Sequence, residues 1–527
     1  MKSLYISFFA LSLLTLGACE KFLKTEPSDF LAPSNYFTTE KDLNNALTGV
    51  YEVLGHSALY GDYIFYQYDI TDEGVYGHAA LTNGVQVYNF APSNPQIDAT
   101  WRALYVGIGR ANLLLENINK PDMNENKRNI IEGETLFLRA YYYFLLAQNW
   151  GGVPLILETT KTADDTQRPR ASLAQVYEQI LTDLKKSESL VQPIGALGFG
   201  GRANKSAVRG MLARVCLHMA GYPLKDQSKY AEAKYWAAKV INDTEAGHEL
   251  NPSYEQVFIN LAADKYDIKE SIFEVEFWGN RSDAYSESGR LGTRNGIRCL
   301  NPDLGYSLGR INATPRLYQR YDEQDKRRDW NIAPFIYPSA SSVTPVYWAP
   351  ENLWQRSSGK YRRQYEVVKP QSTSFSPINY PIMRYADILL MFAEADNELS
   401  TTSMPSDSAV NFVNLIRRRG FGLPMDQAGI ADVSAGDRSS KASFQAFLRD
   451  ERSRELCFEG LRKGDLIRWE KFISEMRATA SEIDMIAVSG YKFEARAGFN
   501  VSEKHLLFPI PSDEMSLNRL LKQNPGW

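Results

Sequence analysis

Cysteine and histidine are scarce in this sequence, which limits the kinds of site that it can build. Only four cysteines and five histidines occur among 527 residues. Metal-binding motifs place several such side chains at short, regular spacings, as in HExxH. His56, His78, His218 and His248 show no such spacing. We therefore expect neither a metal site nor a cofactor.

An excess of basic charge is also missing. The formal net charge is −4 and the isoelectric point is near 5.9. A nucleic-acid-binding surface or a polybasic membrane patch would carry a clear surplus of Lys and Arg, so we expect neither. Long apolar runs are absent after the first 18 residues, because the run Phe144–Ala147 is brief and Asn149 follows it. No later stretch is therefore expected to cross a bilayer.

The amino terminus carries the one sustained apolar run. Lys2 gives a positive start, and Leu4–Ala18 contains no charged residue. A helix over this run would span about 22 Å at 1.5 Å per residue, which is shorter than the bilayer core of about 30 Å. The segment is therefore typical of a secretory signal. Leu16-Gly17-Ala18-Cys19 also resembles the lipobox of bacterial lipoproteins, so we expect cleavage before Cys19 and lipidation of that cysteine.

Acyl chains on Cys19 would hold the mature protein on a membrane, because each buried CH₂ contributes about 0.8 kcal/mol. Residues 1–18 are then a signal peptide, and residues 19–35 a polar, proline-containing tether. An ordinary signal with an incidental cysteine is the alternative. The mature chain keeps three further cysteines, Cys216, Cys299 and Cys457. Three is too few for a disulfide framework, so we expect buried free thiols.

Helical periodicity dominates the remainder. In residues 205–223 an apolar face is formed by Val208, Leu212, Val215 and Met219. Residues 229–242 repeat this spacing with Ala233, Trp236, Ala237 and Val240. Gly221-Tyr222-Pro223 ends the first helix. The result is a helical hairpin with small residues where backbones must approach closely, as in tetratricopeptide repeats.

Two more hairpins have the same character. One joins 385–399 to 408–420, and the other joins 133–152 to 172–190. The pairs are unevenly spaced, which excludes a strict tetratricopeptide array of about 34 residues per repeat. We expect a mostly α fold in a single domain, residues 36–527. Its scaffold of helical hairpins would cover about 36–241 and 382–527.

Residues 242–381, which we call the excursion, interrupt this scaffold. The excursion is rich in Gly, Pro, Ser, Asn and Arg, has little sustained helical period, and contains strand-like pieces such as "SIFEVEFW". It holds four of the nine tryptophans, Trp278, Trp330, Trp348 and Trp354. Such a concentration indicates that the excursion needs flat apolar surfaces.

Six stretches follow one another along the chain in a familiar order: "CEKFL", "ALTGVYEVL", "WRALYVGIGRANLLLENI", "GETLFLRAYYYFLLAQNWGGVPLI", "RYADILLMFAEADNEL" and "ERSRELCFEGLRKGDLIRW". Together with the terminal "LLFPIPSDEMSLNRLLKQNPGW" they resemble the SusD/RagB family of outer-membrane nutrient-binding lipoproteins of the Bacteroidetes. The resemblance runs from Cys19 to Trp527.

This resemblance implies a tetratricopeptide-like α-scaffold whose loop-rich excursion forms the ligand face. It also implies a partner, a SusC-like TonB-dependent barrel, over which the lipoprotein sits as a hinged lid. The implied location is the outer membrane, with a lipid anchor at Cys19. Acids just after the lipidated cysteine accompany surface export in these bacteria, and Glu20 is such an acid, so we expect the protein to face the cell exterior.

One motif supports the hypothesis that the protein is an enzyme. "GYSLG" at residues 305–309 satisfies G-x-S-x-G, in which a strand-to-helix turn exposes a nucleophilic serine. However, "LNPD" rather than an apolar strand precedes the motif, and Pro315 interrupts any following helix. Only His505 lies downstream as a base. We therefore expect a binding protein and no enzyme, with an esterase at Ser307 as an alternative.

A glycan site needs aromatic platforms flanked by bidentate polar groups. Two stretches supply both: residues 63–84, whose "TDE" resembles the "(S/T)DE" that SusD-like proteins carry beside the ligand face, and the excursion. The expected ligand-binding residues are Asp72, Glu73, Tyr76, Trp278, Arg294, Tyr337, Trp348 and Trp354.

The leading hypothesis is capture of an oligosaccharide and its delivery to the transporter. Capture of peptides is the alternative, because the RagB branch, which handles peptides, resembles the chain equally. A third hypothesis is a protein adaptor that binds only its partner protein. An anionic glycan would suit the arginines of the excursion, Arg281, Arg290, Arg294 and Arg298. These can equally pair with Asp283, Glu287 and Asp303.

The charged run at residues 451–469 invites a search for a general acid. Its spacings of three, Glu459 to Arg462 and Asp465 to Arg468, favour a helix held by ion pairs instead. We interpret the run as structural.

Overall fold

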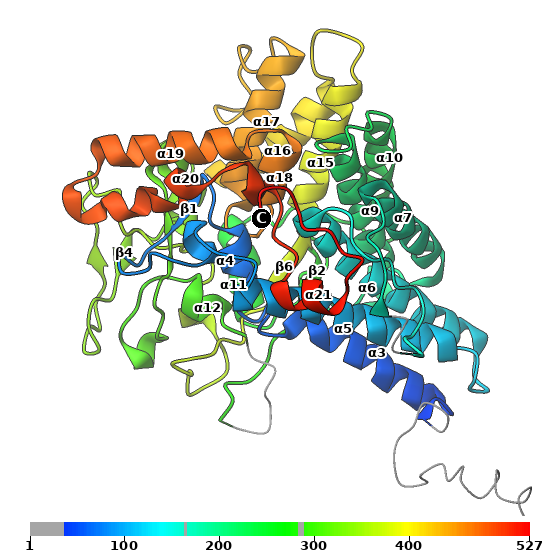
Figure 1. Ribbon diagram of the computed structural model, residues 1–527. Coiled ribbons are helices and arrows are strands. Elements are labelled where there is room, and N and C mark those ends of the chain that lie inside the picture. The colour runs from blue at the N-terminus through cyan, green and yellow to red at the C-terminus, as the bar shows by residue number, and fades with distance from the viewer. Residues whose placement is uncertain (1–35, 163–165, 283–288) are drawn as a thin grey trace, which may run out of the picture.

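The computed structural model of the chain describes residues 36–162, 166–282 and 289–527. Helices make up most of it and the strands are short (Figure 1), which confirms the expected mostly α fold. The expected signal peptide and tether, residues 1–18 and 19–35, lie outside the described residues. Within the described ranges, every helix is too short or too polar to span a bilayer.

The amino-terminal part of the scaffold consists of eight helices in the described residues: α3 (Glu40–Gly55), α4 (Ile64–Tyr68), α5 (Pro95–Asn117), α6 (Glu125–Trp150), α7 (Leu173–Leu190), α8 (Ile194–Leu197), α9 (Lys205–Ala220) and α10 (Lys229–Ile241). Thr39 begins α3 through a reciprocal capping pair with Asp42. Helix α6 packs against both α5 and α7, and α9 packs against α10. Both predicted hairpins in this region are therefore present.

Glycines allow these helices to approach closely. A Cβ at Gly107 of α5 would stand 2.5 Å from a ring carbon of Tyr142 on α6. A Cβ at Gly210 of α9 would stand 2.1 Å from the Met383 sulfur. Real Cβ atoms do not come so near a neighbour, so a larger side chain at either position would force the packed elements apart.

The carboxyl-terminal part of the scaffold contains α15 (Tyr385–Leu399), α16 (Asp407–Phe421), α17 (Lys441–Leu456), α18 (Arg462–Arg468), α19 (Phe472–Ile486), α20 (Arg496–Asn500) and α21 (Ser512–Leu517). Helices α15 and α16 pack as the predicted hairpin. Helix α15 also packs on α10, so the two parts of the scaffold share one core although the excursion separates them in sequence (Figure 1).

The excursion contains short elements. Its helices are α11 (Tyr254–Ala262), α12 (Leu291–Arg294), α13 (Pro315–Gln319) and α14 (Arg327–Asn331). Three antiparallel pairs of strands involve it: β1 (Gly74–Tyr76) with β3 (Ile311–Ala313), β2 (Ser271–Val275) with β6 (Tyr380–Arg384), and β4 (Phe335–Ile336) with β5 (Val346–Tyr347). The strand predicted in "SIFEVEFW" is β2. The helices were not predicted because each is too short to show a repeating apolar face.

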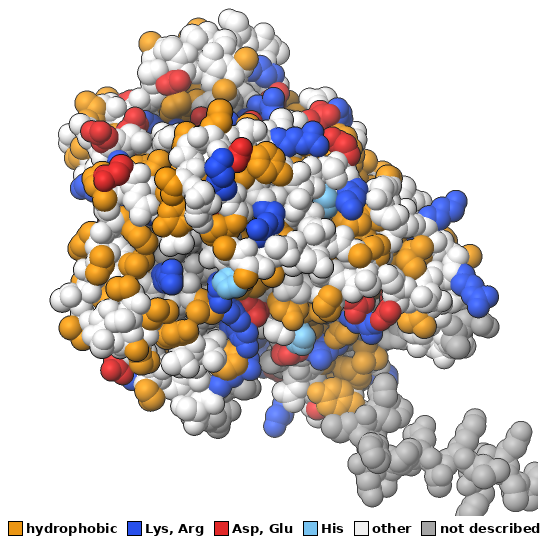
Figure 2. Space-filling model, turned by 60° about the vertical axis from the view of Figure 1, so that its left-hand side comes forward, with side chains coloured by type: hydrophobic (Ala, Val, Ile, Leu, Met, Phe, Trp, Pro, Cys, Tyr) orange, Lys and Arg blue, Asp and Glu red, His pale blue; other side chains and the backbone are white. Residues whose placement is uncertain are grey.

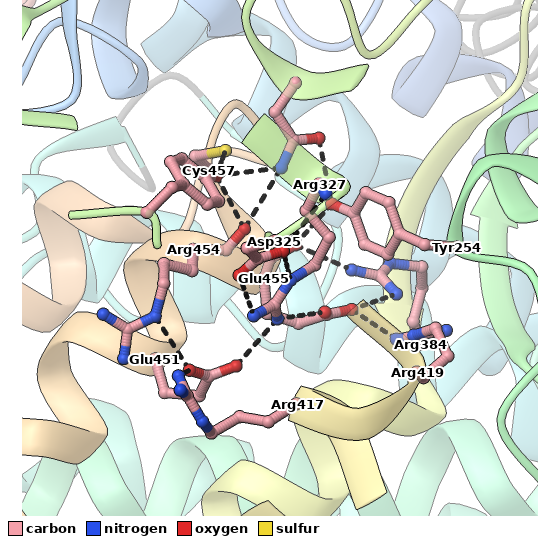
Figure 3. A network of polar contacts seen from close by, with 12 residues as sticks. Tyr254, Asp325, Arg327, Arg384, Arg417, Arg419, Glu451, Arg454, Glu455 and Cys457 are labelled. Carbon is pink, nitrogen blue, oxygen red and sulfur yellow. Dashed lines mark hydrogen bonds and ion pairs between the residues drawn. The ribbon is translucent and has the colours of Figure 1, made fainter. Parts of the chain in front are cut away.

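A network of charged side chains lies inside the molecule (Figure 3). Glu455 of α17 pairs with Arg419 at 2.7 Å, with Arg327 at 3.0 Å and with Arg384 at 3.1 Å. All four side chains are fully buried. Buried ions are tolerated only where partners surround them, so this network fixes how α17, α16, β6 and the excursion meet.

The charged run at residues 451–469 is structural, as interpreted, but one of its predicted pairs is wrong. Asp465 and Arg468 pair at 2.8 Å within α18. Glu459 instead pairs with Arg384 at 2.8 Å and with Lys360 at 2.7 Å. The reason is that α17 ends at Leu456 and α18 begins at Arg462, so Glu459 and Arg462 do not share a helix face.

The cysteines outside the signal region behave as expected. Cys216, Cys299 and Cys457 are buried free thiols. Burial raises the pKa of Cys216 and of Cys457 to about 12, which keeps both thiols protonated and unreactive at neutral pH.

Candidate ligand-binding face

The loop after α4 meets the excursion through backbone hydrogen bonds. Strands β1 and β3 pair antiparallel, with Tyr76 opposite Ile311. Just beyond, the Gly77 N–H donates to the Arg310 carbonyl at 2.8 Å, and the Arg310 N–H donates to the Arg294 carbonyl at 2.8 Å. Three adjacent segments thereby place Tyr76, Arg310 and Arg294 side by side, and two of these residues were predicted for the site.

Tyr76 lies at the centre of a group that we call the Tyr76 cluster: Tyr66, Tyr76, His78, Arg294 and Arg310. The half-buried Tyr76 ring meets the Tyr66 ring edge-on at 5.6 Å, and the His78 ring lies 6.4 Å from the Tyr76 ring. Burial raises the pKa of the Tyr66 phenol, while Arg294 and Arg310 act in the opposite direction. The rings and the guanidinium groups therefore share one small region.

The arginines of this region differ in their pairing. Arg290 lies 3.1 Å from Asp62 and Arg294 lies 3.5 Å from it. Of the partners proposed from the sequence, Asp283 and Glu287 lie outside the described residues. Arg298 and Arg310 are half-buried. Their guanidinium groups make no hydrogen bond or ion pair with the described residues, so no described carboxylate neutralises these two cations.

Figure 2 brings forward the side of the molecule that carries β1 and β4, and shows Lys and Arg side chains among hydrophobic ones. Arg290 also lines an open pocket of about 720 Å³ between the end of α3 and the excursion. In this pocket the Phe375 ring lies 4.0 Å from the Arg281 guanidinium and 5.1 Å from that of Arg290. Such contacts hold both cations against the ring.

The acidic side of the same pocket comes from β2 and the residue after it. Glu274 and Glu276 line the pocket. Burial, with the neighbouring charge of Glu276, raises the pKa of Glu274 to about 7, although Ser271 and Asn379 donate hydrogen bonds to it. At neutral pH this wall therefore carries less negative charge than its two carboxyl groups suggest.

Trp278 follows β2 and is 39% exposed. It lies three residues before Arg281 in the sequence but does not line the pocket. The other two tryptophans predicted for the site, Trp348 and Trp354, are less exposed than Trp278.

Tyr337 and Trp348 lie beside the β4–β5 hairpin. Phe335 of β4 lies 5.8 Å from Tyr337 and 5.5 Å from Tyr347, whose side chain is 67% exposed. Trp348 is half-buried, and its indole N–H has no hydrogen-bond partner among the described residues. The Tyr337 N–H donates to the Arg298 carbonyl at 3.1 Å, so this aromatic group adjoins one of the unpaired arginines.

The structure does not bring Asp72 and Glu73 to this face. The Asp72 side chain is fully buried and pairs with Arg462 at 2.8 Å and with Arg320 at 2.6 Å. Burial opposes ionisation of Asp72, but the two guanidinium groups lower its pKa below the usual range. Burial raises the pKa of Glu73 to about 7. Both carboxyl groups connect parts of the scaffold and are closed to a ligand.

Trp354 is closed to a ligand as well. It is 8% exposed and stacks on Tyr491 with ring centres 6.2 Å apart. It belongs to a small apolar cluster with Val75, Ala480, Ile483, Ala487 and Ala495. Its ring therefore joins the excursion to α19, which is the packing role that competed with a platform in the sequence.

The serine of the G-x-S-x-G motif lies in a closed turn. Ser307 is 1% exposed, accepts a hydrogen bond from the Gly309 N–H at 3.3 Å and donates to the Thr293 carbonyl at 3.4 Å. His505, the one histidine downstream, instead accepts the Ser502 N–H at 3.0 Å. The described residues also contain no group of three or more His, Cys, Asp or Glu arranged to hold a metal ion.

Sequence reasoning missed Arg310, Phe335 and Tyr347. Arg310 stands in no local motif, and only the β1–β3 pairing reveals its place beside Tyr76. Phe335 and Tyr347 were detectable in principle, because each lies within two residues of a predicted aromatic, Tyr337 or Trp348.

Two family profiles match the chain. One, described as the SusD family, matches residues 269–527. The other, described as starch-binding and associating with the outer membrane, matches residues 21–217. Among individual sequences, a SusD-like protein P2 from Formosa agariphila is 26% identical over 541 residues, which cover 100% of both chains.

Solved structures agree with these matches. A SusD homologue from Bacteroides thetaiotaomicron has a TM-score of 0.85 and 28% sequence identity, covering 94% of this chain and 98% of its own. A laminarin-binding SusD-like protein has a TM-score of 0.70 and 23% identity, covering 93% of this chain and 100% of its own. At that identity the second similarity concerns the fold alone.

Proposed function

Because this chain belongs to the SusD family, we propose that it captures an oligosaccharide at the outer membrane and passes it to a SusC-like TonB-dependent transporter. The description of the matching amino-terminal profile as starch-binding and outer-membrane-associated supports this proposal, as does the laminarin-binding relative of the same fold. Lipidation at Cys19 would hold the protein on the membrane, facing the exterior.

The Tyr76 cluster is the observation that carries the proposal. Sugar rings offer apolar C–H faces to aromatic side chains and hydroxyl groups to charged donors. The half-buried Tyr76 ring supplies the first contact, and Arg294 and Arg310 beside it supply the second. The aromatic group at Tyr337, Tyr347 and Trp348 extends the same kind of surface.

The unpaired arginines favour an acidic glycan. A half-buried guanidinium that no described carboxylate pairs is available to a ligand, and a uronate or sulfate group would supply its anion through charge-assisted, bidentate hydrogen bonds. Arg298 and Arg310 are the two cations in this position. The pocket beside Phe375 adjoins the Tyr76 cluster, because Asp62 pairs both with Arg290 of the pocket and with Arg294. Additional sugar units of a longer chain would bind there, and Trp278 is the exposed ring proposed to contact them.

Titration calorimetry tests this proposal. Neutral maltoheptaose and laminarihexaose would be compared with acidic oligosaccharides of alginate and of polygalacturonate. We expect heat from the acidic glycans, with affinity that falls as salt rises. Tyr76→Ala and Arg310→Met should each weaken binding by about tenfold or more.

Matched control variants are available in the same chain. Tyr235 on α10 is 53% exposed, and Arg519 near the carboxyl end is exposed; Tyr235→Ala and Arg519→Met should leave affinity unchanged. Equal losses in the controls would contradict a site at Tyr76. Heat from peptides but from no glycan would replace the oligosaccharide by a peptide ligand, and binding of the barrel alone would favour an adaptor.

A further inference from the structure

A second cavity lies within the helical scaffold. It is an open pocket of about 510 Å³ that is lined by residues of α6, α7, α9 and α18 and of the carboxyl-terminal segment. It shares no lining residue with the pocket beside Phe375. Its apolar wall is formed by Ala147, Leu173, Pro223, Ile467, Leu506, Leu507 and Pro525.

Glycines keep this space open. Gly151 follows the last residue of α6 with a φ of +75°, and a Cβ at Gly152 would stand 2.3 Å from the Ala171 carbonyl oxygen. The chain therefore turns sharply after α6 without placing a side chain in the cavity. On the facing side Gly464 of α18 also has no side chain to fill the space.

Five polar side chains other than the cations line this pocket without a hydrogen bond to any described residue: Gln148, Tyr177, His218, Tyr222 and Glu503. Two of them converge. A Cβ at Gly464 would stand 2.1 Å from the Gln148 amide nitrogen and 3.1 Å from the His218 ring carbon Cε1. None of these polar atoms is fully buried, so they stay accessible from the pocket and can hydrogen-bond a ligand that enters it.

The cations around the cavity are already engaged. Arg170 donates to the carbonyl oxygens of Gly152 and Trp150 at 2.6 and 2.9 Å, and to the Asn524 amide oxygen at 2.7 Å. Arg468 is held by Glu394 and, at 2.8 Å, by Asp465. Lys504 at the rim lies 4.3 Å above the Trp527 ring.

Most of these polar groups are uncharged at neutral pH. Burial, reinforced by the positive charge of Arg468, lowers the pKa of His218 to about 3. Gln148 and Tyr177 carry no charge. Apart from the exposed Glu503 and the engaged cations, the lining of the pocket is therefore an apolar surface with a few neutral donors and acceptors.

We propose that this cavity binds a small, uncharged and largely apolar ring compound that carries one or two hydroxyl, N–H or carbonyl groups, of the phenol or indole type. Small-molecule sites occupy about 300–1,000 Å³ and combine apolar walls with a few convergent polar groups. A free sugar is a poor match, because the mostly apolar walls cannot satisfy hydroxyl groups on every side of its ring. The site is separate from the Tyr76 cluster and does not depend on the function proposed for it.

Saturation-transfer NMR and titration of the full chain with p-cresol and indole test the proposal, with glucose as the polar comparison. We expect p-cresol and indole to bind with dissociation constants of about 1 mM or below. Leu173→Trp and Leu506→Trp fill the cavity from two different elements and should each weaken binding about tenfold or more. Gln148→Leu should weaken it by about three- to tenfold, as loss of one hydrogen bond does.

Leu517→Trp is the matched control, because Leu517 is 68% exposed and lies outside the cavity. Its affinity should equal that of the unaltered chain, and a thermal melt identifies any variant that fails to fold. Failure of both ring compounds to bind the unaltered chain overturns the proposal. Full affinity in both folded tryptophan variants overturns it too, as does glucose binding as tightly as p-cresol.

Discussion

Asp72 and Arg462, which are 390 residues apart in the chain, form a bidentate ion pair: Nε and Nη2 of the arginine donate to the two carboxylate oxygens at 3.0 and 2.8 Å. Arg320 of the excursion completes the group by donating to Asp72 at 2.6 Å. One carboxylate near the amino end thus joins the excursion to α18 in the interior.

Asp72→Asn should destabilise the protein strongly. The substitution keeps the shape of the side chain but removes the carboxylate that both guanidinium groups contact most closely, and leaves Arg320 with Asp450 at 3.2 Å and Arg462 with Glu73 at 3.3 Å. Loss of one partner from such a buried group costs about 3–5 kcal/mol of the free energy of unfolding. Denaturant titration measures this difference. Asp513 pairs with Arg102 on the surface, with side chains 72% and 54% exposed, so Asp513→Asn should change it by about 1 kcal/mol or less. Similar losses in both variants would contradict the structural role.

Trp354 and Trp278 should respond differently to removal of their rings. Trp354 fills the contact between the excursion and α19, so Trp354→Ala leaves a cavity and should lower the free energy of unfolding by about 3–5 kcal/mol. Trp278 is 39% exposed, and Trp278→Ala should have a much smaller effect on stability. Thermal and denaturant unfolding of the two variants give the comparison. A Trp354→Ala protein as stable as the unaltered chain would show that the ring is not part of the packing.

Glu494 should make stability depend on pH. Burial raises its pKa from 4.5 to about 7, although Asn312 donates to it at 3.2 Å. Between these values the folded protein binds more protons than the unfolded chain, so its stability falls as pH rises through this window. Glu494→Gln removes the effect. The variant should gain about 1–3 kcal/mol relative to the unaltered chain between pH 4 and pH 8. Unfolding curves at several pH values measure this gain, and a difference that does not change with pH would contradict it.

Lys463 has the opposite dependence. Its Nζ lies 3.4 Å from the Gln67 carbonyl oxygen and 4.1 Å above the Phe508 ring, and burial lowers its pKa from 10.5 to about 7. The unfolded chain therefore binds more protons between these values, and stability rises with pH across that window. Lys463→Met should stabilise the protein by about 1–3 kcal/mol at pH 7, and by less at pH 9.5.

Denaturant unfolding at the two pH values checks this expectation. The control is Lys492→Met, because the Lys492 side chain is 48% exposed and its loss should change stability by about 0.5 kcal/mol or less. A Lys463→Met variant that is less stable than the unaltered chain at pH 7 would show that the aromatic contacts outweigh the burial of the amine.

The helical hairpins could be predicted from the sequence because an apolar face repeats locally, as in Val208, Leu212 and Val215 of α9. The site was harder to predict. Tyr76 and Arg294 are 218 residues apart in number, and only the pairing of β1 with β3 and the bonds beside it bring them together. Pairing between distant short strands has no signature in a single sequence.

The sequence also did not reveal which of the predicted site residues are exposed. Trp278 and Trp354 have similar surroundings in composition, yet the first is 39% and the second 8% exposed, because α19 happens to cover one of them. Asp72 was predicted beside the ligand from its place in a motif. Its burial is decided by Arg320 and Arg462, which approach from the excursion and from α18.

Residues near the carboxyl end of the sequence pack against the core formed by the amino-terminal helices. The Trp150 indole N–H at the end of α6 donates to the Pro509 carbonyl at 2.8 Å, and the Trp527 ring lies 5.0 Å from Phe90. A ribosome adds these residues long after the helices that they complete. A nascent chain therefore cannot close this part of its core until they have been made, so a chain that crosses a membrane amino end first would still be loose enough to be threaded through a narrow channel.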